Sequence, residues 1–267
     1  MTHEYATFFF TNLFSTQRWL WAILGACVGS FLSVVIYRLP VMLEARERGE
    51  PLPFTLSFPA SACPVCKNPL TFWANLPVVG YLLSKGRCSH CAVQIPARYL
   101  LLELVAAGWA LAATYLWHTP MAIGAWSVFG WYLLAMGWMD AQTKWLPDSL
   151  TLGLLWLGLA FSTNAGALVP ASTAIAAAAA VYLVARALDT AFIAMRGQSG
   201  LGGGDAKLLA AFGAWFGGMP VLYIATGACF LFVLQYVLLH KEGDDTAVAF
   251  GPALCAVAAV VAGYLAL

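Results

Sequence analysis

The sequence predicts an all-α, polytopic membrane protein of about eight transmembrane helices, and its composition and charge are the observations behind this prediction. Of the 267 residues, 62% are hydrophobic and 9% are charged, and the mean hydropathy is +0.80. Soluble domains carry about 25% charged residues and about 45–50% apolar ones, so a soluble enzyme and a disordered chain are excluded. Lys and Arg (13) balance Asp and Glu (12), which leaves no basic surface for nucleic acid.

Eight apolar segments approach the length of about 20 residues that a spanning helix needs. The fourth and sixth are short, so seven or eight spans are expected. The Ala-rich run at 174–180 and the scattered glycines favour close helix packing in lipid. The first 18 residues lack a basic region and a small-residue cleavage site, so no removable signal peptide is expected. The segments are residues 19–39, 99–117, 121–139, 149–162, 171–188, 206–218, 220–239 and 247–267.

The distribution of Lys and Arg predicts the orientation in the membrane. With eight spans, one side receives twelve of these residues and the other receives only Arg18. The positive-inside rule then places the N-terminus outside and the polar segment between the first two spans in the cytoplasm. We therefore expect a first transmembrane helix at 19–39, a cytoplasmic segment at 40–98 and a transmembrane helix bundle at 99–267.

Four of the seven cysteines form two Cys-x-x-Cys pairs, and 21 residues separate the pairs. Two such pairs can place four thiolates tetrahedrally around one Zn²⁺, and a closed four-ligand site is structural. A disulfide or redox interpretation competes, but a reducing cytoplasm disfavours it. His90 is an alternative ligand, although a polar loop histidine is the favoured interpretation of this residue. The predicted ligands are Cys63, Cys66, Cys88 and Cys91, whereas Cys27, Cys229 and Cys255 lie inside apolar spans and are expected in the core.

Five acidic residues fall within or beside the apolar spans, where an ionised side chain is costly and is a functional candidate by default. For Asp148, which follows Pro147 just ahead of the fourth span, helix N-capping is the favoured interpretation. For Asp189 a structural role at a helix end or at the membrane interface is favoured. The other three are Glu103, Asp140 and Asp205.

Asp140 and Asp205 are the candidate catalytic pair. The third span runs inward and ends at Asp140, whereas the sixth runs outward and begins after Gly202-Gly203-Gly204-Asp205, so both acids are expected at the cytoplasmic boundary. Three glycines allow unusual backbone conformations and the close approach of another chain. Two carboxylates in a partly desolvated site do not both ionise easily, so one keeps a proton while the other serves as general base for peptide hydrolysis.

Two other function classes compete with a protease of this kind. A proton-coupled transporter would use the same aspartates as a relay, but it predicts acids near the bilayer midplane and inverted repeats, and no repeat is visible. A zinc metalloprotease would require His-Glu-x-x-His on a helix, and the four histidines stand far apart in the sequence.

Several stretches, in order, carry a family resemblance. They are residues 29–40 (Gly-Ser-Phe-Leu-Ser-Val-Val-Ile-Tyr-Arg-Leu-Pro), the two cysteine pairs with Asn75-Leu76-Pro77 between them, Arg98-Tyr99 followed by Glu103, Asp140 through Leu146-Pro147-Asp148, and Gly202-Gly203-Gly204-Asp205-Ala206-Lys207. This ordered set resembles the bacterial type 4 prepilin peptidase family of the inner membrane. Ser33 departs from the Asn that is usual there, and Gly203 from the common Phe.

The resemblance implies an aspartic endopeptidase of the GxGD type whose catalytic pair maps onto Asp140 and Asp205. Such an enzyme cuts a basic leader from prepilins and pseudopilins at the cytoplasmic face. It then methylates the freed N-terminal amine with S-adenosylmethionine. The chain has no GxGxxG motif after a strand, so the cofactor site is unassigned. The candidate supporting residues for substrate or cofactor are Gly202, Gly203, Gly204, Asn75, Arg98 and Glu103.

Overall fold

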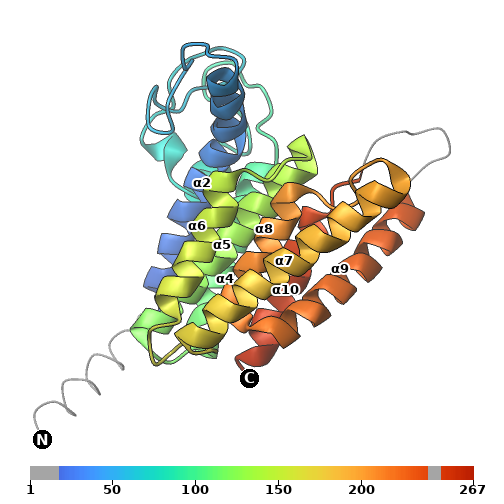
Figure 1. Cartoon of the computed structure of the whole chain (residues 1–267). Helices are drawn as coiled ribbons and strands as arrows, with labels where there is room; N and C mark the ends of the chain where they lie inside the picture. The colour runs from blue at the N-terminus through green and yellow to red at the C-terminus, as the bar shows by residue number, and fades with distance from the viewer. Residues whose placement is uncertain (1–17, 240–247) are drawn as a thin grey trace, which may run out of the picture. The chain divides into compact units, whose positions relative to one another are not determined.

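The computed structural model describes residues 18–239 and 248–267, and these residues are helical apart from turns, bends, irregular loops and two isolated β-bridges. Every expected apolar segment coincides with a helix (Figure 1). The expectation about a signal peptide, and the first residue of the last expected span, lie outside the described residues. The helices are α2 (Arg18–Glu47), α3 (Val79–Leu83), α4 (Arg98–Leu116), α5 (Pro120–Thr143), α6 (Asp148–Phe161), α7 (Ala171–Arg196), α8 (Gly203–Phe216), α9 (Gly218–Leu239) and α10 (Gly251–Leu265), with a 3₁₀ turn, η1, at Trp73–Asn75.

The helix lengths support a membrane protein. Among the described residues, α2, α4, α5, α7 and α9 are long and apolar enough to cross a bilayer, whereas α6 and α10 are shorter apolar helices. Helix α8 has only 14 residues. The chain forms two compact units, residues 1–131 and 132–267, and the boundary falls within α5.

In the first unit, α2 and α4 pack closely through glycines. A side chain at Gly25 would lie 2.5 Å from the carbonyl oxygen of Ala106, and one at Gly29 would lie 2.7 Å from Cα of Glu103. This spacing of small residues, four positions apart, lets two helix backbones approach in lipid. Helix α2 does not end near Leu39 as expected; it continues through Pro40 to Glu47.

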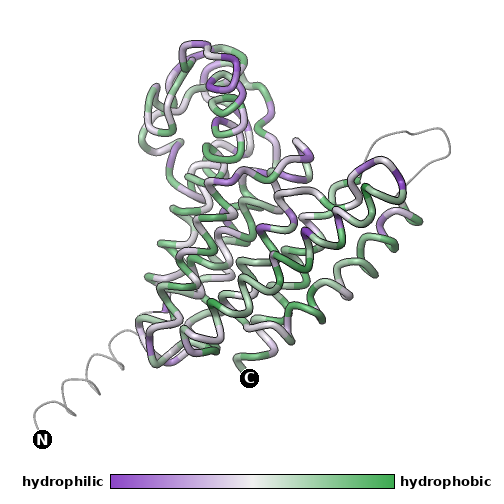
Figure 2. The backbone as a smooth tube through the Cα atoms, in the orientation of Figure 1, coloured by the Kyte–Doolittle hydropathy of each residue, from purple (hydrophilic) through white to green (hydrophobic). Residues whose placement is uncertain are grey.

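The connection between α2 and α4, residues 48–97, carries η1 and α3 and lies beyond the C-terminal end of α2 (Figure 1). Figure 2 shows many hydrophilic residues in this connection, whereas hydrophobic residues dominate the long helices. Arg38 fixes the start of the connection because its guanidinium donates hydrogen bonds to the carbonyls of Thr55 (2.7 Å) and Pro59 (2.8 Å).

In the second unit, α8 is buried along almost its whole length, from Ala206 to Phe216, apart from Lys207. A helix that is apolar all round is typical of a core position. It packs against α6, where the indole of Trp215 donates a hydrogen bond to the carbonyl of Leu154 (3.0 Å). It also packs against the Ala-rich run of α7, because a side chain at Gly213 would lie 3.0 Å from the backbone of Ala177. The packing of α8 against α6 and α7 thus fixes the position of its first turn.

Candidate active site and metal centre

Asp140 lies near the C-terminal end of α5 and is only 6% exposed. Its Oδ2 accepts a hydrogen bond of 2.9 Å from the backbone N–H of Gly251, the first residue of α10. The first amides of a helix have no partner within the helix, and this end carries a partial positive charge. The start of α10 therefore orients the Asp140 carboxylate and stabilises its negative charge.

Asp205 lies in the first turn of α8. A side chain at Gly202 would lie 2.8 Å from its Oδ2, so the loop backbone passes directly beside the carboxylate. Asp205 lies within range of the negative charge of Asp140, and the buried Cys255 of α10 lies within range of both aspartates. The second unit therefore brings together two carboxylates that are 65 residues apart in the sequence.

The three glycines before Asp205 serve different purposes. A side chain at Gly202 would lie 2.8 Å from Oδ2 of Asp205, and one at Gly204 would lie 2.7 Å from Cβ of Leu146. A side chain at Gly203 would meet nothing within 4 Å. Close approach therefore requires the first and third glycines, whereas the middle position is open. A larger residue at position 203 is therefore sterically allowed.

The prediction for Asp148 was wrong. Pro147 occupies the N-cap position of α6, and no side chain caps this helix. Asp148 stands in the first turn with its side chain 61% exposed, and its Oδ1 accepts a hydrogen bond from Nζ of Lys207 in α8. The residue thus joins two helices at the surface.

The four cysteines of the two pairs come together in the connection between α2 and α4. Their sulfur atoms all lie within 4.8 Å of one another, so the group can hold a metal ion. Sγ of Cys63 is 3.8 Å from Sγ of Cys91, and Sγ of Cys66 is 3.9 Å from Sγ of Cys88. This group contains the four predicted ligands and does not include His90.

The two cysteine pairs adopt the same local structure. In one, the N–H of Lys67 donates to the carbonyl of Cys63 (2.9 Å), and in the other the N–H of Ala92 donates to that of Cys88 (2.9 Å). Lys67 and Ala92 both have positive φ, 59° and 57°. Two equivalent turns that face each other produce one four-sulfur group.

The thiols of this group ionise unequally. Backbone N–H groups of Cys66 and Val65 donate to the sulfur of Cys63 and lower its pKa from 9.0 to about 6. Despite a hydrogen bond from the Val93 amide, desolvation and the neighbouring thiols raise the pKa of Cys91 to about 11. Four adjacent thiolates therefore need a cation, because their mutual repulsion otherwise keeps a proton on Cys91.

The predicted supporting residues of the first unit differ in their surroundings. Asn75 is exposed in η1, and Arg98 is exposed at the start of α4, with its guanidinium 5.3 Å from the ring centre of Tyr99. Glu103 is buried, and its Oε2 accepts a hydrogen bond of 2.7 Å from the N–H of Val78. Glu103 thus anchors the connection to α4.

The structure also shows the surroundings of Ser33 and of the three cysteines in the apolar spans. Ser33, the departure in α2, donates a hydrogen bond to the carbonyl of Gly29 (3.3 Å) within its own helix. Cys255 is buried as expected. The expectation of a core position was wrong for Cys27 and Cys229, which are exposed on their helices, since an apolar span shows no sequence contrast between its inner and outer faces.

One residue that sequence reasoning missed is Gly251, which contributes only a backbone amide to Asp140. The Gly-Pro pair at 251–252 could have marked a helix start, though not a contact with Asp140, because Pro in the first turn is typical of a helix start. A helix start is a source of free amide donors.

The helices and the two sites define a helical membrane protein with a paired-aspartate site and a tetracysteine metal-binding site. The family model described as "Bacterial Peptidase A24 N-terminal domain" matches residues 23–117, and the one described as "Type IV leader peptidase family" matches residues 127–238. The chain belongs to the type IV leader peptidase family.

Curated relatives match along most of both chains. The prepilin leader peptidase/N-methyltransferase of Neisseria gonorrhoeae is 38% identical over 87% of this chain and 85% of its own. The protein of the same name from Aeromonas salmonicida is 39% identical (90% and 86%), and that from Dichelobacter nodosus is 36% identical (96% and 90%). No solved structure matches the chain.

Proposed function

We propose that this protein is a prepilin leader peptidase and N-methyltransferase of the bacterial inner membrane. It cleaves the basic leader from prepilins and pseudopilins and then methylates the new N-terminus. The observation that carries the proposal is the placement of two aspartates in one compact unit: Asp140 is buried near the end of α5, and Asp205 lies in the first turn of α8. It occurs in a chain whose relatives carry this double name over most of their length.

In the cleavage step, Asp140 and Asp205 flank the water that attacks the scissile peptide bond. One carboxylate removes a proton from this water while the other, protonated, donates a proton to the carbonyl oxygen or to the leaving amine. The Gly251 amide holds the Asp140 carboxylate in a fixed orientation during the reaction. The exposed backbone of Gly202 and Gly203 offers an open surface to the substrate backbone.

The proposed topology brings the leader to this site. Twelve of the thirteen Lys and Arg residues fall on one side of an eight-span arrangement, and the positive-inside rule makes that side cytoplasmic. The N-terminus is then periplasmic, and residues 40–98 form a cytoplasmic segment. The apolar helix of the prepilin lies in the bilayer while its leader stays in the cytoplasm, so the scissile bond falls at the membrane boundary.

The metal that fits the tetracysteine group is Zn²⁺ in a structural role. Zn–S bonds of about 2.3 Å in a tetrahedron place sulfur atoms about 3.8 Å apart, which agrees with the Cys63–Cys91 and Cys66–Cys88 separations of 3.8 and 3.9 Å. Cys63, Cys66, Cys88 and Cys91 would hold the ion. Zinc would supply the positive charge that four adjacent thiolates need and would hold the two turns together.

The methylation step uses S-adenosylmethionine as methyl donor, which the names of the relatives imply. Of the supporting residues in the first unit, Glu103 is already engaged by the Val78 amide. The exposed side chains of Asn75 and Arg98 remain free to contact substrate or methyl donor.

A mass measurement tests both activities. The purified protein in detergent is incubated with a synthetic prepilin peptide, with and without S-adenosylmethionine. The expected product lacks the leader and, with the methyl donor, carries one added methyl group. Asp140→Asn and Asp205→Asn abolish cleavage, while both variants still methylate a peptide that begins at the cleaved residue. Asp148→Asn is the control, because exposed ion pairs contribute little. Cleavage by either of the first two variants would contradict the assignment.

A further inference from the structure

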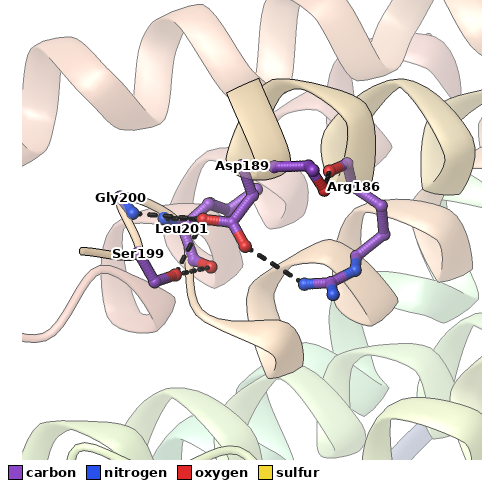
Figure 3. Close-up of polar contacts among 6 residues, drawn as sticks. Arg186, Asp189, Ser199, Gly200 and Leu201 are labelled. Carbon is purple, nitrogen blue, oxygen red and sulfur yellow. Dashed lines mark hydrogen bonds and ion pairs between the residues drawn. The ribbon is translucent and has the colours of Figure 1, made fainter. Parts of the chain in front are cut away.

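Asp189 is a buried carboxylate that the paired-aspartate site does not include. It lies in α7, two helical turns before the helix ends at Arg196, and is 4% exposed. Figure 3 shows its Oδ1 accepting hydrogen bonds from the hydroxyl of Ser199 (2.7 Å) and from the amides of Gly200 and Leu201 (both 3.1 Å). The side chain therefore does not extend to the membrane surface; it binds the loop that leads into α8.

This loop is folded back against α7. Gly197 ends the helix with φ of +74°, and the chain then returns toward Asp189. At Gly200 the backbone lies against the ring of Phe192, because a side chain there would come within 2.7 Å of a ring carbon. Packing and hydrogen bonds thus hold the same three residues, 199–201, on one face of α7.

The loop contacts both carboxylates in turn. The amides of Gly200 and Leu201 donate to Asp189, and the next residue, Gly202, lies against Asp205, because a side chain there would come within 2.8 Å of Oδ2. The carbonyl of Gly202 accepts the amide of Ala206 (3.1 Å) and so begins α8. The two peptide units that Asp189 holds are therefore followed directly by the residue that lies against Asp205.

We propose that Asp189 is a positioning residue for the cleavage reaction, which acts by fixing the 199–202 loop so that the Gly202 backbone keeps the Asp205 carboxylate in place. The inference rests on the proposed protease function. Without the carboxylate, the amides of Gly200 and Leu201 and the hydroxyl of Ser199 lose their common acceptor, and with it the hydrogen bonds that hold the loop on α7. The loop then rearranges, and the Asp205 carboxylate leaves its place beside Asp140.

The structure supplies a graded set of variants. Asp189→Ala removes the acceptor, whereas Asp189→Asn keeps one oxygen in the same place without the charge. Arg186→Gln is the matched control: this guanidinium is 3.1 Å from Oδ2, the oxygen that does not hold the loop, and its side chain is 45% exposed. The loss of this guanidinium leaves the three hydrogen bonds between Oδ1 and the loop intact.

We expect Asp189→Ala to lower kcat for leader cleavage about 100-fold with KM unchanged, since a displacement of about 1 Å has this effect. Asp189→Asn restores kcat to within about tenfold of the original protein, because neutral hydrogen bonds replace charge-assisted ones. Arg186→Gln retains full activity. All three methylate a pre-cleaved peptide at the original rate, which shows that the variants are folded.

Three outcomes would overturn the inference. The first is an unchanged kcat in Asp189→Ala, and the second is an equal loss of cleavage and methylation, which indicates a role in overall stability. The third is the same kcat loss in Asp189→Asn as in Asp189→Ala. Asp205→Asn is measured in parallel. Cleavage by that variant would refute the proposed function itself, whereas an inactive Asp205→Asn beside a fully active Asp189→Ala refutes only the role of Asp189.

Discussion

The backbone amide of Gly251 donates a hydrogen bond of 2.9 Å to Oδ2 of Asp140, across 111 residues of sequence. A buried carboxylate needs donors to stay in place, and here the N-terminus of α10 supplies one. A side chain at position 251 would lie 2.7 Å from the same oxygen and 3.0 Å from Cγ. Only glycine allows both the hydrogen bond and the close approach.

Gly251→Ala is therefore expected to push the Asp140 carboxylate away from the amide and to lower kcat for leader cleavage. A hydrogen bond to a charged group contributes about 1.5–3 kcal/mol, which corresponds to a loss of about 10- to 100-fold. Steady-state cleavage of a prepilin peptide measures this loss. Gly263→Ala, in the same helix, is the control, because a side chain there meets nothing within 4 Å. Equal activity of the two variants would contradict the prediction.

The helices could be predicted well from the sequence because most of them are long apolar segments, and the residue types alone reveal such a segment. It also predicted the tetracysteine group, since the two Cys-x-x-Cys pairs carry their ligands at fixed local spacing. Both predictions depend on local patterns in the chain, an apolar run in one case and a Cys-x-x-Cys pair in the other.

Contacts between distant segments were harder to predict. The cap expected at Asp148 is wrong because Pro147 takes that position and Lys207, 59 residues away, binds the carboxylate. For Asp189 we expected a structural role at a helix end or at the membrane interface. Instead, its side chain is buried and binds the loop that follows α7. Gly251 has no polar side chain, so nothing in the sequence marked it as a partner of Asp140.

Removal of the metal is expected to open the two cysteine turns without affecting the helix bundle. The group closes a loop of more than 20 residues, and structural zinc sites contribute directly to folding. Chelation, or Cys88→Ser, should make residues 48–97 sensitive to a protease while the helices stay protected, as mass analysis of the fragments would show. Cys229→Ser, exposed on α9, should retain both metal and resistance. Unchanged metal content in Cys88→Ser would refute the site.

Metal retention should depend on pH through Cys63. Hydrogen bonds from the amides of Cys66 and Val65 lower the pKa of this thiol from 9.0 to about 6, so the thiolate form is already present at pH 7. Protons compete for the sulfur only as the pH falls through about 6, and metal is then released. The metal content after equilibration between pH 8 and pH 5 measures this. Loss of the metal already at pH 7 to 8 would contradict the prediction.

The glycines before Asp205 provide the last prediction, because substitutions at neighbouring positions should differ sharply. Gly203→Ala places its side chain in open space, and cleavage should stay within about twofold of the original rate, since surface substitutions usually change little. Gly202→Ala and Gly204→Ala introduce contacts of 2.8 Å with Oδ2 of Asp205 and 2.7 Å with Cβ of Leu146. Both should displace the first turn of α8 and lower kcat by about 100-fold. The three cleavage rates are measured on one prepilin peptide, and methylation of a pre-cleaved peptide is the control for folding. A loss at positions 202 and 204 but not at 203 supports the conclusion that close backbone approach at the first and third glycines positions Asp205. Similar losses at all three positions would instead indicate that helix propensity or general flexibility matters there.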